Sequence, residues 1–396
     1  MKTNWKRNII IVCCLSAGAL VPTACSSLID DDTDICLAEY DAEYELRLVT
    51  NEEHELARVL ADRTDIADAL RAHLSGVFTD NGRELDLSFY DSAAAQPRFR
   101  HDEVAMSGPT KTMHVSLPVG QQMHLAVANM KDNGPAQFVG FDAPWRQAAI
   151  ALNMTDVQPA TEPAGEGKVS VDGIDTGLPA DFAPNTAVAS QKTGIFTGRK
   201  HLSAPVFGPY NYYMPLYIAN SAAAIAIDPR TAPITDVMIF TTGFATSLSV
   251  ADSTYTFDNM PLVRAEQVNL SDTTKWLCFC TVNFPSKDLA NAKQAPISNL
   301  SSLNSNLSTR SAVDTDEPFI YQDCLQNFWR YECYVKMKDG TITRTLITIR
   351  HPLRAGQLKV IRGHIDGSGV IRVNETEAGT SIDTKWEPGY EHEIVI

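Results

Sequence analysis

The residue with the most definite chemistry in this sequence is Cys25, which stands directly behind two small residues, Thr23 and Ala24. Ahead of them, a basic beginning without acids leads into an almost unbroken apolar run over 9–21. This order is typical of a secretory signal peptide over 1–24, and the run is shorter than the roughly 20 residues that span a bilayer. A cysteine at this position predicts a lipobox, with Cys25 acylated, for example by palmitate.

An ordinary secretory signal with a coincidental cysteine is the alternative, because Pro22 stands where a lipobox more commonly has an aliphatic residue. If Cys25 carries two or three acyl chains, they hold the protein at a membrane without a transmembrane helix. The prediction is therefore attachment through lipid on Cys25 rather than through a membrane-spanning segment.

An acidic stretch follows the cysteine and contains Asp30, Asp31, Asp32 and Asp34. It resembles the surface-export signal of Bacteroidota lipoproteins, and it is also a solvated tether that cannot pack into a core. The two interpretations are compatible. We expect a lipidated acidic tether over 25–40 and a surface-exposed lipoprotein of the cell outer membrane.

Five further cysteines remain in the mature chain, so at least one stays unpaired unless it bonds another chain: Cys36, Cys278, Cys280, Cys324 and Cys333. Cys324 and Cys333 could bridge the ends of a hairpin in an oxidising compartment. Cys278 and Cys280 flank Phe279 on a strand-like run, and we expect them as small buried apolar residues rather than as metal ligands. The pairing among the five is otherwise left open.

Residue types that carry catalysis are present, but not in catalytic spacing. The histidines are scattered singly, without the spacing of a metal site, and the chain has no phosphate loop, dinucleotide-binding glycine pattern or serine-hydrolase motif. The neighbouring acids Glu52 and Glu53 and the pair His54-Glu55 are interpreted as exposed. We expect no enzymatic activity, no metal and no cofactor.

The net charge of the chain limits its partners. It is −15, and it becomes −18 without residues 1–24, which carry Lys2, Lys6 and Arg7. Such a surface repels phosphate backbones, so nucleic-acid binding is not expected.

The elements that would position these residues are mostly strands. Alternation of apolar and polar residues is typical of half-buried strands, and strands are expected at 44–49, 85–90, 113–117 and 122–130. Residues 54–74 change to helical spacing, which predicts one or two short surface helices. The stretch 159–184 is rich in Gly, Pro, Ala and Asp and is the best candidate for a linker.

A second strand-rich block follows the linker. Strands are expected at 212–228, 237–242, 248–250, 277–284 and 329–337, and turns of hairpins at 338–340 and 366–369. Residues 296–314 lack any period and are expected as an exposed loop. Short strands at this spacing predict an all-β protein with short helices, with an N-terminal β-sandwich domain over 41–185 and a C-terminal one over 186–396.

Several segments together resemble the FimB-like fimbrial anchor and tip family of Bacteroidales type V fimbriae. They are the acidic spacer with Cys36, the strand 44–49, the turn Leu117-Pro118-Val119-Gly120, the segment 194–199 before the small-residue strand 218–227, and the ending 379–396 with its Trp386-Glu387-Pro388-Gly389 turn. Their order over nearly the whole mature chain makes the resemblance specific. The chain departs from the family in the strand 222–227 and in the long loop 296–314.

The resemblance implies two transthyretin-like β-sandwich domains, no enzymatic activity and fimbrial subunits as partners, joined by strand exchange. In such exchange, a strand of one subunit pairs with an unpaired sheet edge of the next. The C-terminus fits a donor strand, because Tyr390, His392, Ile394 and Ile396 alternate with polar or smaller residues. The alternative is that this segment is the last strand of its own sandwich.

The resemblance also implies that stalk subunits lose their first strand when a protease cuts after an arginine in a loop. Here Arg47 lies within an expected strand, and Arg58 and Arg63 lie in helix-like sequence. Such positions are poor protease substrates because cleavage needs a mobile backbone. We therefore expect an anchor subunit that ends the fimbria at the outer membrane. The alternatives are a fimbrial tip or stalk subunit, or a surface lipoprotein that binds glycans or host proteins.

Overall fold

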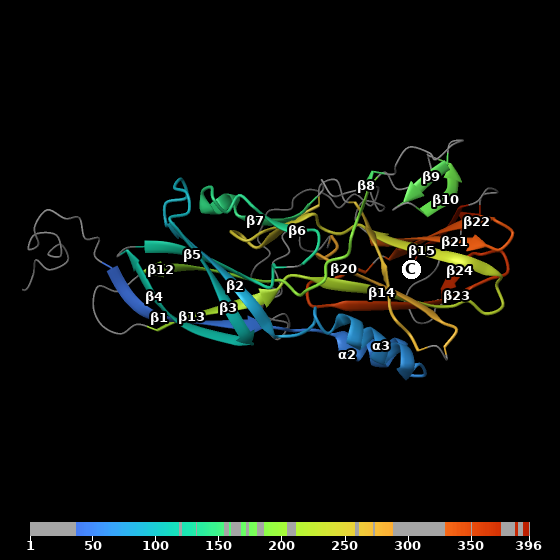
Figure 1. The fold of residues 1–396 in the computed structure, drawn as a ribbon, viewed down its shortest axis with the longest axis horizontal. Coiled ribbons are helices and arrows are strands. Elements are labelled where there is room, and N and C mark those ends of the chain that lie inside the picture. The colour runs from blue at the N-terminus through green and yellow to red at the C-terminus, as the bar shows by residue number, and fades with distance from the viewer. Residues whose placement is uncertain are drawn as a thin grey trace, which may run out of the picture.

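The fold of the chain is built mainly from β-strands, as the computed structural model shows (Figure 1). It describes residues 37–118, 121–131, 133–153, 158–159, 168–171, 174–179, 186–203, 211–257, 261–271, 274–287, 329–349, 351–373, 385–386 and 391–395. Within these residues, the α-helices are α2 (Glu52–Val59) and α3 (Thr64–Leu74). The expected all-β class with short helices is thus confirmed, and the transthyretin-like topology stays a prediction.

A seven-stranded sheet, sheet A, forms the end of the molecule that contains the first strand (Figure 1). Its strands, in spatial order, are β3 (Arg100–Gly108), β2 (Gly82–Asp91), β5 (Gln121–Ala128), β12 (Phe196–Ser203), β13 (Asn211–Ile218), β1 (Leu37–Arg47) and β4 (Thr110–Pro118). The sheet curls around its own core, so that the Tyr44 ring of β1 meets the His124 ring of β5 with centroids 5.5 Å apart. Sheet A takes β12 and β13 from beyond residue 185.

A small four-stranded sheet, sheet B, packs on the outside of sheet A. Its strands are β17 (Thr254–Thr256), β16 (Ser247–Ser249), β7 (Ala149–Leu152) and β6 (Ala136–Val139). The shared core includes Leu125 and Val127 from sheet A and Ile150 and Leu248 from sheet B, all fully buried. A 3₁₀ turn, η1 (Trp145–Gln147), leads into β7.

The other end of the molecule is a sandwich of two sheets (Figure 1). Sheet C contains β25 (Lys385–Trp386), β26 (Glu391–Val395), β22 (Ile342–Ile349), β21 (Trp329–Met337), β15 (Ile234–Thr242), β18 (Leu262–Arg264), β11 (Thr186–Val188) and β8 (Gln158–Pro159). Sheet E contains β19 (Glu266–Gln267), β20 (Leu277–Asn283), β14 (Ser221–Asp228), β23 (Leu358–Ile365) and β24 (Ile371–Val373). Apolar side chains such as Ile225, Tyr331 and Ile361 fill the space between them.

The other face of sheet E is covered by α2 and α3, whose buried residues Leu56, Ile66 and Leu70 join the core of sheet A. Ala222, Ala224 and further small residues lie on that face, where their short side chains leave room for the helices to pack. Within the expected linker 159–184 the structure describes Pro159, the last residue of β8, and a separate hairpin, β9 (Lys168–Val171) with β10 (Ile174–Pro179).

One expected strand proved to be two. Residues 212–228 form β13 in sheet A and β14 in sheet E, joined through Ala219 and Asn220. The Asn220 side chain accepts a hydrogen bond from the backbone N–H of Ile195, so the polar residue satisfies a buried donor where the chain changes sheets. The hairpins at 338–340 and 366–369 are confirmed, and the loop 296–314 lies outside the described residues.

The chain segments that cross between the two ends meet at Gly356, in the connection between β22 and β23. The backbone N–H of Gly356 donates to the Asn220 carbonyl, and its carbonyl accepts from the N–H of Asn51. Gly356 has φ +72°, and a Cβ there would lie 2.1 Å from the carbonyl oxygen of Val49. Only glycine lets the segment after β1 lie this close to the second sandwich.

Gly356→Ala is expected to lower the free energy of unfolding by about 2–3 kcal/mol, because a methyl group adds backbone strain and a steric clash. Gly340→Ala is the matched control: Gly340 also has a positive φ, +87°, but its Cβ would meet nothing within 4 Å. Urea denaturation of both variants separates the two causes. Equal losses for both would show that the contact with Val49 contributes nothing.

Candidate functional site: the first strand and its connection to the second sandwich

The first strand, β1, is an interior strand of sheet A. It pairs in parallel with β13 and antiparallel with β4 along most of its length. One face of β1 is buried through Tyr40, Ala42, Tyr44 and Leu46, while the acids of the other face point outward, as the alternating sequence predicts. The strand begins at Leu37, inside the expected tether 25–40. Removing β1 would therefore expose two strand edges and part of the core.

The arginines that bear on cleavage are all held by side-chain contacts. Arg47 is the last residue of β1, where its guanidinium donates to the Tyr213 hydroxyl and pairs with Glu45. Arg58 lies in α2, as expected, and pairs with Glu55. Arg63 is the residue directly before α3 rather than within a helix.

The side chain of Arg63 is the most extensively engaged of the three. It donates to Asp65 and to Thr274, and its guanidinium carbon lies 4.5 Å from the centroid of the Trp276 ring. Arg362 lies over the same ring at 4.8 Å and forms a bidentate ion pair with Asp62. The connection between α2 and α3 is thus fixed to sheet E by the cation–π contact of Arg63 with Trp276 and by the ion pair of Asp62 with Arg362.

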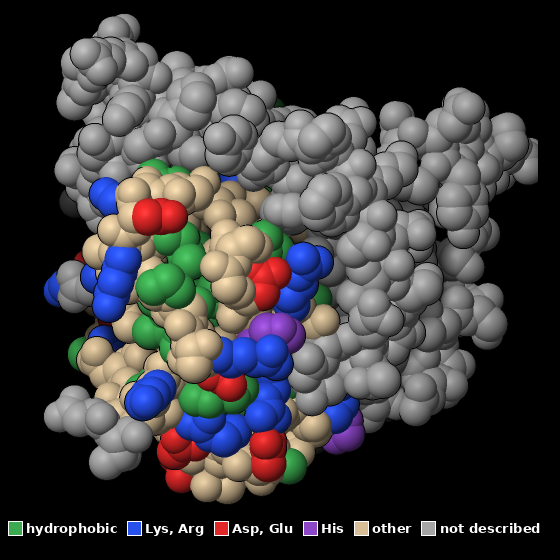
Figure 2. All heavy atoms as spheres, turned by 90° about the vertical axis from the view of Figure 1, so that its right-hand side faces the viewer, with side chains coloured by type: hydrophobic (Ala, Val, Ile, Leu, Met, Phe, Trp, Pro, Cys, Tyr) green, Lys and Arg blue, Asp and Glu red, His purple; other side chains and the backbone are tan. Residues whose placement is uncertain are grey.

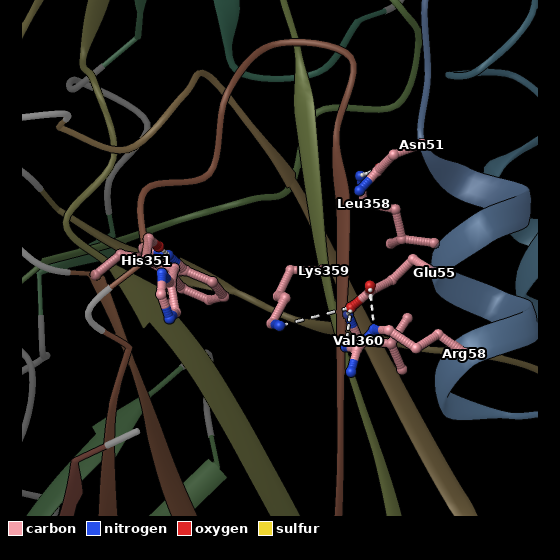
Figure 3. A network of polar contacts seen from close by, with 8 residues as sticks. Asn51, Glu55, Arg58, His351, Leu358, Lys359 and Val360 are labelled. Atoms are coloured by element: carbon pink, nitrogen blue, oxygen red, sulfur yellow. Dashed lines mark hydrogen bonds and ion pairs between the residues drawn. The ribbon is translucent and has the colours of Figure 1, made fainter. Parts of the chain in front are cut away.

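The segment after β1 is bound to β23 through polar side chains (Figure 3). The Asn51 side-chain oxygen accepts from the backbone N–H of Leu358 at 2.6 Å, and a Glu55 carboxylate oxygen accepts from the N–H of Val360 at 3.0 Å. The same carboxylate accepts from Arg58 at 2.9–3.0 Å and lies 3.8 Å from the Lys359 ammonium. Residues from the two ends of the sequence thereby form one network.

The sequence-based interpretation of Glu52 and Glu55 as exposed was wrong, because their side chains are buried, at 8% and 5% exposure. Each lies four residues before a buried apolar residue of α2, Glu52 before Leu56 and Glu55 before Val59, on the helix face that meets sheet E. Burial would raise the pKa of Glu55, but hydrogen bonds from Arg58 and Val360 outweigh it and lower that pKa. Burial next to Glu53 raises the pKa of Glu52 to about 7.

His124 is a second buried polar residue that the sequence did not single out. It lies in the core of sheet A at 1% exposure, stacked on Phe89 with ring centroids 4.3 Å apart and near Tyr44 of β1. Among the described residues, neither of its ring nitrogens has a hydrogen-bond partner. Because burial disfavours the charged imidazolium, the pKa of His124 is lowered to about 3.

The C-terminal segment lies beside sheet C. The backbone of β26 pairs in parallel with β22, in a register that places His392 opposite Thr345 and Ile394 opposite Ile347. Tyr390 and Ile396 lie outside the described residues. Within this chain the segment is paired as a strand of sheet C. Its role as a donor strand for a partner stays a prediction.

The cysteines divide between the core and the parts that are not described. Cys278 and Cys280 are buried on β20 as free thiols, as expected for small apolar residues, and burial raises the pKa of Cys278 to about 12. Cys333 is a buried free thiol on β21. Cys25, Cys36 and Cys324 lie outside the described residues, so lipidation and a bond between Cys324 and Cys333 stay predictions.

Elsewhere, the described residues form neither a metal-binding cluster nor a membrane-spanning helix. Figure 2 shows the end of the molecule formed by the second sandwich, where Lys and Arg side chains lie among Asp and Glu side chains. Within the described parts of the chain, no three His, Cys, Asp or Glu side chains gather to hold a metal ion. No helix among the described residues is both long and apolar enough to cross a bilayer.

Comparison with known proteins gives structural matches only. No family profile and no curated protein matches the chain. A candidate polysaccharide-binding protein of Bacteroides thetaiotaomicron has a TM-score of 0.44 at 8% identity, with 85% of this chain and 96% of that chain covered. A candidate adhesin of Bacteroides ovatus has a TM-score of 0.43 at 9% identity, with 78% and 82% covered.

The fimbrial anchor protein Mfa2 of Porphyromonas gingivalis has a TM-score of 0.41 at 8% identity, with 85% of this chain and 97% of that chain covered. The matches therefore include the class of protein that the sequence resemblance names. At these identities and TM-scores, the likeness alone assigns no function to this chain.

Proposed function

We propose that the chain is a non-enzymatic fimbrial subunit, held at the outer membrane by lipid on Cys25, and that it is the anchor that ends the fimbria there. The observation that carries the anchor role is the position of β1. This strand is paired on both edges, and the segment that follows it is bound to β23 through Asn51 and Glu55. A first strand held in this way is retained, so it keeps the lipid joined to the rest of the chain.

Mass spectrometry of the mature protein from outer membranes tests the anchor role. The expected result is a single chain that begins with acylated Cys25 and continues through Arg47, Arg58 and Arg63. Cleavage after any of these arginines would contradict the anchor role, because it would separate β1 and the lipid from the rest. A Cys25→Ser variant, as the control for the lipid, should no longer be retained in the membrane fraction.

We further propose that the subunit joins its neighbour through β-strand exchange, with the C-terminal segment as the donor. The alternating residues Tyr390, His392, Ile394 and Ile396 support this role, because alternate side chains can fill pockets in a partner's groove. A variant without residues 390–396 is expected to remain folded and to lose binding to a fimbrial subunit, measured by co-purification. Unchanged co-purification would exclude this segment as the donor.

A further inference from the structure

The outer edge of β23 is only partly paired with another described strand. On one side β23 pairs in parallel with β14 from Leu358 to His364. On the other side β24 pairs only with residues 363–365, and no other described strand pairs with the edge at 358–362. Backbone donors along this part of β23 would otherwise face outward with no strand to accept them.

Residues 51–62 lie along this edge and accept hydrogen bonds from its backbone N–H groups at Leu358 and Val360. Asn51 bonds the carbonyl of Gly356 through its backbone N–H and the N–H of Leu358 through its side chain. Glu55 then accepts from the N–H of Val360, as Figure 3 shows. A spacing of two residues is that of the outward backbone groups of a strand, so side chains here replace the carbonyls of a neighbouring strand.

The far end of the segment is fixed as well. Asp62 holds the Arg362 guanidinium with two hydrogen bonds of 2.6 and 2.8 Å. The Trp276 ring lies against both Arg362 and Arg63. The contacts at 356, 358, 360 and 362 therefore follow one line, from the end of β1 to the start of α3.

We propose that residues 51–62 form an edge shield, which stops a second copy of this chain from adding a strand to β23. An exposed edge readily pairs with a strand of another chain. A protein that joins partners through strands needs its other edges closed, and here a helix with two side-chain acceptors closes this one. The inference adds to the proposed strand exchange, but it does not depend on the lipid or on the C-terminal donor.

The test combines Asn51→Ala, Glu55→Ala and Asp62→Ala in the purified mature protein. In dilute solution, peptides that cover 356–362 should exchange their amide hydrogens about tenfold faster than in the unaltered protein. At higher concentration the variant should elute as a dimer or a larger species, and protection of these amides should return. The matched control is Glu53→Ala with Asp68→Ala, which alters exposed acids of the same helices that pair with Arg71 instead.

Circular dichroism shows whether the triple variant folds, and Asn51→Ala alone replaces it if it does not. Exchange as slow as in the control would overturn the shield. Faster exchange without any rise in mass would overturn it too, because the opened edge would then add no strand. Loss of fimbrial joining, whatever the mass of the variant, would concern the proposed function and not the shield.

Discussion

Glu55→Ala is expected to lower the free energy of unfolding by about 3 kcal/mol, which is among the largest effects of any single change at this site. The carboxylate is buried and accepts hydrogen bonds from Val360 and Arg58, with Lys359 nearby. Its removal leaves a buried N–H without its acceptor and cations without their counter-charge. Urea denaturation at neutral pH measures the loss.

Glu55→Gln should cost less than Glu55→Ala, because the amide keeps one oxygen for the Val360 N–H and loses only the charge and the second acceptor for Arg58. Glu53→Ala is the control on the same helix. Its carboxylate is exposed and pairs with Arg71 at the surface, and exposed pairs contribute little. If Glu55→Ala were no more harmful than Glu53→Ala, the network in Figure 3 would not hold the segment to β23.

The local elements could be predicted because their patterns follow from periodicity. Alternation of Tyr44 and Leu46 with acids indicates a strand with one polar face, and the apolar spacing after residue 54 indicates a helix. Turn glycines such as Gly340 mark hairpins. These signals depend only on neighbours in the sequence, so the structure confirms them.

The candidate site could not be predicted in the same way, because it depends on partners far apart in the chain. Glu55 looks like an exposed acid until the N–H of Val360 is known to lie beside it. Helical spacing does place Glu55 one turn before Val59 on the buried face, which was the one available signal. Sequence patterns likewise cannot show that β1 pairs with β13, since a parallel partner is set by topology rather than by a turn.

Acid is expected to weaken the core of sheet A through His124. The pKa of His124 is lowered to about 3 in the folded protein by burial, whereas an unfolded chain has about 6.5. The unfolded state therefore binds the proton more readily, so stability falls as the pH drops from about 6.5 towards 3. The loss from this group between pH 7 and pH 4 is about 3 kcal/mol.

His124→Phe isolates this contribution, because a phenyl ring can keep the stacking on Phe89 and carries no titratable nitrogen. Glu52 acts in the opposite direction. Its pKa is about 7 in the folded protein and lower in the unfolded chain, so the folded state gains stability from this group as the pH falls below 7. The informative quantity is thus the difference between the unaltered protein and the variant in urea denaturation at both pH values. That difference should grow by about 3 kcal/mol in favour of the variant on acidification. The matched control is the same change at His54, which is exposed and lies outside this core. A constant difference for His124→Phe would mean that water or a rearranged core solvates the ring, and that Tyr44 and β1 are packed less tightly than their burial implies.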